Sequence, residues 1–148
     1  MNPNVKISEK LAILATLDPA SVAAGTVLTA WVPVAGFNSI AALIQTGVLG
    51  AAATVDAKLR QATDAAGAGA KDIASKAIAQ IVKATGDNVQ AIVECRADDL
   101  DTTNGYGHVA LSITVGAAAS LLGAALIGGN ARFMPASASN QAAVKQVI

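Results

Sequence analysis

The densest group of side chains that could do chemistry is the acidic run Asp98–Asp101, which Asn104 follows. Calcium sites collect several oxygens from one loop, with acidic or amide residues at alternate positions ahead of a glycine. Asp99 and Asp101 fit that alternation, but Thr103 stands at the third ligand position. We therefore interpret the run as a solvated loop in which an aspartate caps a turn, with a bound cation as the alternative.

A second candidate is the segment GAGAKD at Gly67–Asp72, which is superficially similar to a phosphate-binding loop. That loop needs four residues between its glycines and a lysine followed by Ser or Thr, whose hydroxyl holds magnesium. Here Asp72 follows Lys71, and its carboxylate would repel a phosphate. The segment is therefore expected to be a loop between two strands.

The single cysteine, Cys95, and the single histidine, His108, lie in no pattern typical of catalysis. A nucleophilic thiol needs a nearby histidine and an electropositive setting, and the sequence shows no relation between the two residues. No serine lies in a nucleophile-elbow pattern, and no group of His and Cys has metal-ligand spacing. The apolar alternation around Cys95 predicts a small buried hydrophobic residue instead. We expect a protein that is not an enzyme and that needs neither cofactor nor metal.

The composition is unusual for a lone soluble domain. The chain has 148 residues, a formal net charge of zero, 53% hydrophobic residues and only 14% charged residues. A typical soluble domain carries about 25% charged residues. Zero net charge disfavours nucleic acid or an anionic membrane surface as a partner, because both select a basic excess. The shortage of charge predicts that much of the surface faces another protein.

Two long uncharged segments, residues 19–55 and 109–131, could be mistaken for membrane spans. Proline and several glycines divide the first segment into short pieces. In Val109–Val115, larger apolar residues alternate with small or polar ones. Period-two alternation is typical of a half-buried strand rather than of a helix in lipid. We therefore expect strands in both segments and no membrane contact.

Similar alternation recurs along the chain at short, regular spacing. The predicted strands are residues 26–34, 39–46, 52–60, 89–96, 109–115 and 121–127, whereas residues 71–83 fit either a helix or a strand. Glycine-bearing turns separate these segments. The pattern predicts an all-β, mainly antiparallel domain of about seven strands, a β-sandwich or a barrel-like fold.

The two ends of the chain are expected to be extended arms. The predicted organisation is an N-terminal arm at 1–25, a β-sandwich domain at 26–134 and a C-terminal tail at 135–148. One short helix is expected at residues 8–16, because Ser8 can cap it and proline after Asp18 stops it. Trp31 is expected in the core, with a role as an interface anchor as the alternative.

Most of the chain resembles a family of small virion structural proteins of tailed bacteriophages, whose genes lie near the major capsid gene. The resemblance rests on Trp31 ahead of the Gly36–Phe37 pair and on four blocks of sequence. These are DAKLRQATDAAGAGAKDI from Asp56, RADDLD from Arg96, GYGHVALSITVG from Gly105 and LGAALIGGNARFMPAS from Leu122. The motifs are structural rather than catalytic, so they specify the family better than the role.

The resemblance implies a capsid cement or decoration protein that binds the assembled head shell. Its partners would be the major capsid protein and further copies of itself, for instance as a trimer. It would lie on the capsid surface of a virion assembled in the bacterial host cytoplasm. The residues expected to make these contacts are Lys6, Lys10, Leu11, Trp31, Arg132 and Phe133, and the two terminal arms are expected to reach across subunits.

Two alternatives stay open at this point. The same particle could use the chain as a head–tail connector or a tail component. A protein of another class, a small sugar-binding or enzymatic module, would need a polar pocket and, for binding, exposed aromatic platforms. Aromatic residues make up only 3% of the chain, which disfavours that class.

Overall fold

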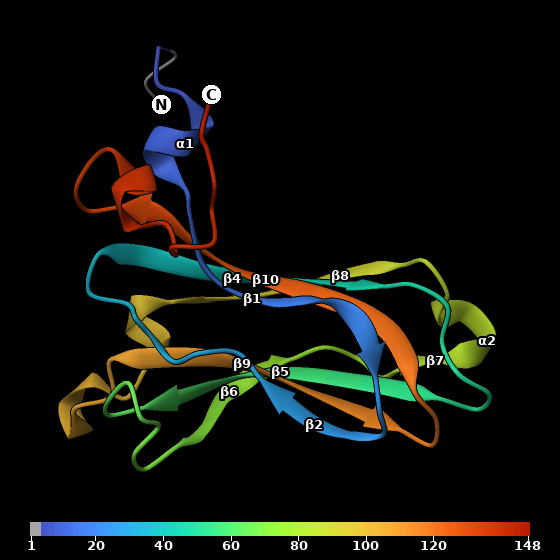
Figure 1. Cartoon of the computed structure of the whole chain (residues 1–148). Coiled ribbons are helices and arrows are strands. Elements are labelled where there is room, and N and C mark those ends of the chain that lie inside the picture. Colours follow the sequence, from blue (N-terminus) through green and yellow to red (C-terminus); the bar gives the residue numbers. More distant parts are fainter. Residues whose placement is uncertain (1–3) are drawn as a thin grey trace.

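Two antiparallel sheets pack face to face in the computed structural model, which describes residues 4–148 (Figure 1). Sheet A has the order β1 (Ala12–Val22), β10 (Ser120–Ala131), β4 (Phe37–Thr46) and β8 (Gln90–Arg96). Sheet B has the order β2 (Gly25–Leu28), β9 (His108–Gly116), β5 (Thr54–Ala62) and β6 (Lys71–Ala77), with β3 (Val32–Pro33) on β9 and β7 (Ile81–Val82) on β5. The short helices are α1 (Ile7–Lys10) and α2 (Lys83–Gly86), with 3-10 turns η1 (Ala97–Asp99), η2 (Thr102–Asn104) and η3 (Ala136–Ser139).

The strands pair as one long hairpin that has been rolled up. Around the loop at residues 63–70, β5 pairs with β6, β4 with β8, β2 and β3 with β9, and β1 with β10. Rolling this hairpin also brings β10 beside β4 and β9 beside β5. The result is the winding of a jelly roll, in which successive strand pairs of the hairpin belong alternately to the two sheets.

The core lies between the sheets and follows the period-two pattern of the sequence. On β9, Val109, Leu111 and Ile113 are fully buried, and Leu59 of β5 lies opposite Leu111 in the ladder. Antiparallel strands that cover a core on one face alternate apolar and polar side chains in this way. The expected all-β sandwich is therefore confirmed.

The strand count and several boundaries differ from expectation. The part of the chain at 4–148 forms ten strands rather than about seven. Residues 26–34 divide into β2 and β3 at Thr29. The Thr29 N–H still donates to Leu111 O at 3.0 Å, but the Leu111 N–H donates to the side-chain Oγ1 of Thr29, at 3.0 Å, instead of to a backbone carbonyl. The ambiguous residues 71–83 form β6, β7 and the start of α2.

The N-terminal segment is not an arm over residues 12–22, which corrects the prediction. The helix expected at residues 8–16 is only the single turn α1, and β1 begins at Ala12 and pairs with β10. Ala12 and Ala15 face the core, so pairing with β10 outweighs the helical spacing of the apolar residues. The proline after Asp18 does not end the segment but lies in a register shift within β1. Residues 1–3 of the expected arm lie outside the described residues.

The C-terminal tail folds back on its own chain instead of extending away. Gln141 N–H donates to Ile13 O at 2.8 Å, and Ile13 N–H donates to the side-chain oxygen of Asn140 at 2.8 Å. Ala136, at the start of η3 in this tail, is buried in the hydrophobic core. The edge of β1 thus holds residues 140–141, and both chain ends project together from one end of the sandwich (Figure 1).

Both long uncharged segments form strands, β4 in the first and β9 and β10 in the second. Within residues 4–148, no helix has the length and apolar character needed to cross a bilayer.

Candidate interaction surface

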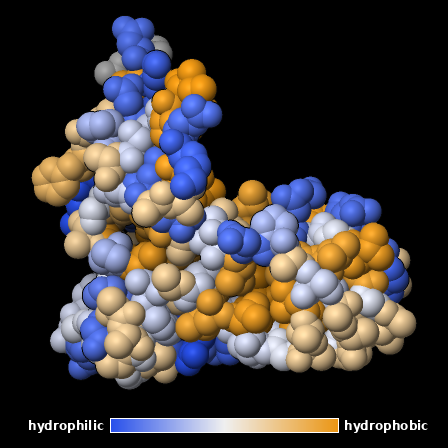
Figure 2. Space-filling model, in the orientation of Figure 1, coloured by the Kyte–Doolittle hydropathy of each residue, from blue (hydrophilic) through white to orange (hydrophobic). Residues whose placement is uncertain are grey.

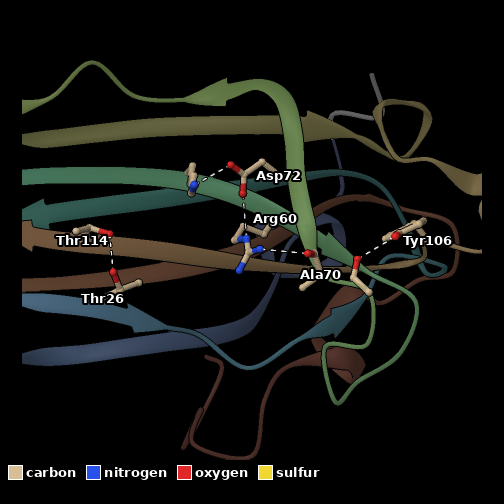
Figure 3. A network of polar contacts seen from close by, with 8 residues as sticks. Thr26, Arg60, Ala70, Asp72, Tyr106 and Thr114 are labelled. Atoms are coloured by element: carbon tan, nitrogen blue, oxygen red, sulfur yellow. Dashed lines mark hydrogen bonds and ion pairs between the residues drawn. The ribbon is translucent and has the colours of Figure 1, made fainter.

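The outer face of sheet B is charged and internally paired. Asp72 Oδ2 accepts from Lys58 Nζ at 2.7 Å, and its Oδ1 accepts from Arg60 Nε at 3.0 Å (Figure 3). Beside them, the hydroxyls of Thr26 and Thr114 hydrogen-bond at 2.8 Å. The Lys58 hydrogen bond is the main reason that the pKa of Asp72 lies below its usual range. The charged and hydroxyl side chains of this face interact favourably with water.

The outer face of sheet A has the opposite character. Its two central strands, β10 and β4, contain no charged residue at all. In the register, Ile13 lies beside Ile127, and Leu43 lies between Ala125 and Ile92. The charges of this sheet are confined to its edge strands, as Asp18 in β1 and Glu94 and Arg96 in β8. An apolar face of this kind is typical of contact with another protein.

A shallow groove of about 630 Å³ runs over β10 between β1 and β4. Gly123 and Ala125 line its floor, and Leu43 and Leu121 stand beside them. Asp18 is the one ionisable residue of its lining. Asp18 is therefore the single candidate for acid–base chemistry in this groove.

The projecting end of the molecule forms a second surface, which we call the terminal platform: residues 4–11 and 131–148. Here α1 packs against η3 and the end of β10. Phe133 is 80% exposed, Ile7 75%, Met134 54% and Val147 52%, which is unusual for large apolar side chains. Figure 2 shows that hydrophilic and hydrophobic residues alternate on this projection. Its charges are Lys6, Lys10, Arg132 and Lys145 against Glu9, an excess of cations.

Five of the six predicted contact residues gather on the terminal platform. Lys6, Lys10 and Leu11 come from α1 and the residues beside it, and Arg132 and Phe133 follow β10 directly. They are 120 or more positions apart in sequence, and the pairing of β1 with β10 brings the two segments together. Their role in binding stays a prediction.

Trp31 does not join them. It lies between β2 and β3, half-buried, with its indole directly over Gly67 of the β5–β6 loop. A Cβ on Gly67 would fall 2.5 Å from the indole nitrogen. Trp31 therefore packs against the hairpin loop of its own chain.

The Gly-Ala loop at residues 63–70, part of which is similar to a phosphate loop, is held by its own hydrogen bonds. Asp64 accepts from the N–H groups of Ala66 and Ala68, and the Ala68 bond is the main reason that the pKa of Asp64 is lowered. The Tyr106 hydroxyl donates to Gly69 O at 2.9 Å (Figure 3). These bonds shape a hairpin turn and leave no cradle of free amides.

Two acidic residues of the candidate calcium loop, Asp99 and Asp101, form ion pairs with lysines of β6. Lys71 contacts Asp101 at 2.6 Å, and Lys76 contacts Asp99 at 3.1 Å. The Lys71 hydrogen bond is the main reason that the pKa of Asp101 is lowered, and the N–H of Arg96 does the same for Asp99. Among residues 4–148, no three His, Cys, Asp or Glu side chains form a metal-binding group. The loop is thus tied to sheet B by ion pairs.

Cys95 is buried in the core on β8, where it was expected. Burial raises the pKa of its thiol to about 11, which keeps the thiol protonated and unreactive at neutral pH.

Sequence reasoning missed Ile92, which lies on the outer face of β8 and is 68% exposed. The signal was present, because Ile92 takes a polar position between Gln90 and Glu94 in the alternation of β8.

Comparison with known proteins assigns no family. No family model matches the chain, and no curated protein matches it either. Among solved structures, a Triatoma virus protein aligns over 95% of this chain and 74% of its own, with 10% identity and a TM-score of 0.49. A protein of the infectious bursal disease virus Gt strain aligns over 93% of this chain but only 37% of its own, with 8% identity and a TM-score of 0.45.

A third structure is that of TmCBM61 in complex with beta-1,4-galactotriose. It aligns over 73% of this chain and 68% of its own, with 12% identity and a TM-score of 0.39. Viral proteins and a sugar-bound protein thus appear together in the comparison. At these identities and scores, the matches do not assign a function to this chain.

Proposed function

We propose that this chain is a non-enzymatic structural protein of a virus particle, and that it acts as a cement protein on the head shell. The observation that carries the proposal is the terminal platform, on which exposed apolar side chains and an excess of cations converge from both chain ends. The resemblance of the sequence to phage virion proteins supports the same role. The low charge of the whole chain and of the outer face of sheet A agrees with a protein that is bound to other proteins in a particle.

In this role the sandwich is a rigid body and the terminal platform is its attachment point. Phe133 would insert into an apolar pocket of the shell, because buried aromatic residues dominate the energy of many interfaces. The cations around it would face acidic groups of the major capsid subunits, which guides association. Many weak contacts repeated over a shell add to a large total. The charged outer face of sheet B would then face water.

The proposal is tested by adding purified protein to shells that lack it and measuring the bound amount by gel densitometry. Phe133→Ala is expected to weaken binding at least about tenfold. Lys6→Glu is expected to weaken it too, and added salt should reduce the difference from wild type. The controls lie on sheet B, where Val82→Ala shortens an exposed apolar side chain and Lys58→Glu reverses a charge. Circular dichroism checks the fold of Lys58→Glu, because Lys58 pairs with Asp72. Undiminished occupancy with both platform variants would overturn the proposal.

The same measurement separates a cement protein from a connector or tail component. A cement protein occupies sites all over the shell, so its copy number follows that of the major capsid protein. A connector or tail ring holds roughly six or twelve copies, because it has ring symmetry. A copy number in that low range would replace the cement role by the connector role.

A further inference from the structure

Strand β8 is an open edge of sheet A. Its seven residues contain neither glycine nor proline, and its register with β4 is unbroken from Ser39–Arg96 to Gln45–Gln90. The opposite edge, β1, has two register shifts and holds the C-terminal tail. In sheet B, β6 also has a register shift and β2 has only four residues. Proteins usually protect exposed edges in such ways or with charged side chains. Over the described residues, strand β8 has no register shift and no covering segment, and its charged residues are Glu94 and Arg96.

The backbone of β8 offers hydrogen-bonding groups along this edge. Thr46 N–H donates to Val89 O at 2.9 Å, which marks Val89 as a residue whose backbone faces β4. Because this orientation alternates along an antiparallel strand, the N–H and C=O groups of Gln90, Ile92 and Glu94 face away from β4. Within residues 4–148, these three residues have no backbone hydrogen-bond partner on that side. The next residue in the series, Arg96, is already capped, because its N–H donates to Asp99 at 2.8 Å.

The side chains of the same three residues are complementary to those of an antiparallel second copy. Ile92 stands in the middle and is 68% exposed, and Gln90 and Glu94 lie two positions to either side. In an antiparallel pair centred on Ile92, the two isoleucines are opposite each other. Each Gln90 then faces the Glu94 of the other copy, so an amide donor meets a carboxylate twice. No two like charges face each other in this register.

We infer that a second copy of this chain pairs with β8 along this edge, strand against strand, with Ile92 on the two-fold axis. The pairing joins two copies of sheet A into one continuous sheet and satisfies the free backbone groups of both edges. It also brings the two exposed Ile92 side chains into contact with each other on the outer face of the joined sheet. Such an interface uses the same surface on both partners, as two-fold contacts do. The inference does not depend on shell binding, because it concerns the free protein.

The oligomeric state of the full chain tests the inference directly. At roughly 100 µM, light scattering after gel filtration should give twice the chain mass of 14.6 kDa. Ile92→Lys should raise the dissociation constant at least about tenfold, because it places two ammonium groups in the centre of the interface. Val48→Lys is the matched control, since Val48 is 54% exposed in a loop outside β8. A wild-type monomer or trimer, or a dimer that Ile92→Lys leaves intact, would overturn the inference.

Two substitutions at one exposed position test the register. Gln90→Lys places a cation opposite Glu94 of the second copy and should lower the dissociation constant about threefold to tenfold, since the pair forms twice. Gln90→Glu places two carboxylates opposite each other and should raise it by a similar factor. Circular dichroism checks that both variants keep the wild-type fold. Equal effects of the two substitutions would contradict the register centred on Ile92.

Discussion

The indole of Trp31 lies over Gly67, with 2.5 Å between its nitrogen and the position that a Cβ on Gly67 would occupy. Gly67 also has a φ of +85°, a conformation that glycine adopts without the strain other residues meet. The contact joins the β2–β3 connection to the β5–β6 loop, which is the tip of the rolled hairpin. It shows that the only tryptophan serves the fold of its own chain.

Gly67→Ala should therefore destabilise the protein by roughly 1–3 kcal/mol, through backbone strain and a clash with the indole. Gly105→Ala is the control, because Gly105 has a φ of +82° but open space around its Cα. Urea unfolding of both variants measures the free energy of unfolding. The difference between them isolates the contact with Trp31, and equal losses would show that this contact contributes nothing.

The Asp72 carboxylate should make stability depend on pH. Its pKa is lowered in the folded protein, mainly by the Lys58 hydrogen bond, so its contribution is present above the pKa of the unfolded chain. The contribution is lost as the pH falls through the folded pKa. Because both side chains are partly exposed, we expect only about 0.2–1 kcal/mol. Asp72→Asn should remove this part of the acid-side slope in urea unfolding between pH 6 and about pH 3. A slope unchanged from wild type would contradict the expectation.

Leu111→Ala should cost roughly 2–5 kcal/mol, because it opens a cavity where β9 and β5 meet in the core. Leu111 is fully buried opposite Leu59. Val48→Ala, at an exposed loop position, should change the free energy of unfolding by less than about 0.5 kcal/mol. Thermal unfolding of the two variants gives the comparison. A loss at Leu111 as small as that at Val48 would show that the core is arranged differently.

Asn140→Ala should release the C-terminal tail from β1. The substitution removes the acceptor of the Ile13 N–H and should cost roughly 0.5–1.5 kcal/mol locally. Amide hydrogen exchange at Ile13 should become faster, while exchange in β9 should not change. Gln146→Ala, at an exposed position further along the tail, is the control. Unchanged protection of Ile13 would indicate that the tail is held by other contacts.

Local sequence determined the sheet core and the turns. Strand Thr54–Ala62 carries its period-two burial pattern in its own residues, so the amino-acid sequence is enough to predict it. In His108–Gly116 the larger apolar residues alternate with small or polar ones along the sequence, although Ala110 and Ser112 between them are buried as well. The burial of Cys95 followed from the same pattern. The low charge of the chain led to the expectation that it faces other proteins, which stays a prediction.

Only the tertiary structure decided the conformation of the N-terminal and C-terminal segments. Residues 8–16 have the spacing of a helix, but β10 pairs with residues 12–16 from more than 100 positions away along the chain. The same distance in sequence separates Lys10 from Phe133 on the terminal platform. Pairing between remote segments is set by the summed packing of the whole chain rather than by local preference. For the same reason, the open edge at Ile92 became visible only when β8 took its place at the end of sheet A.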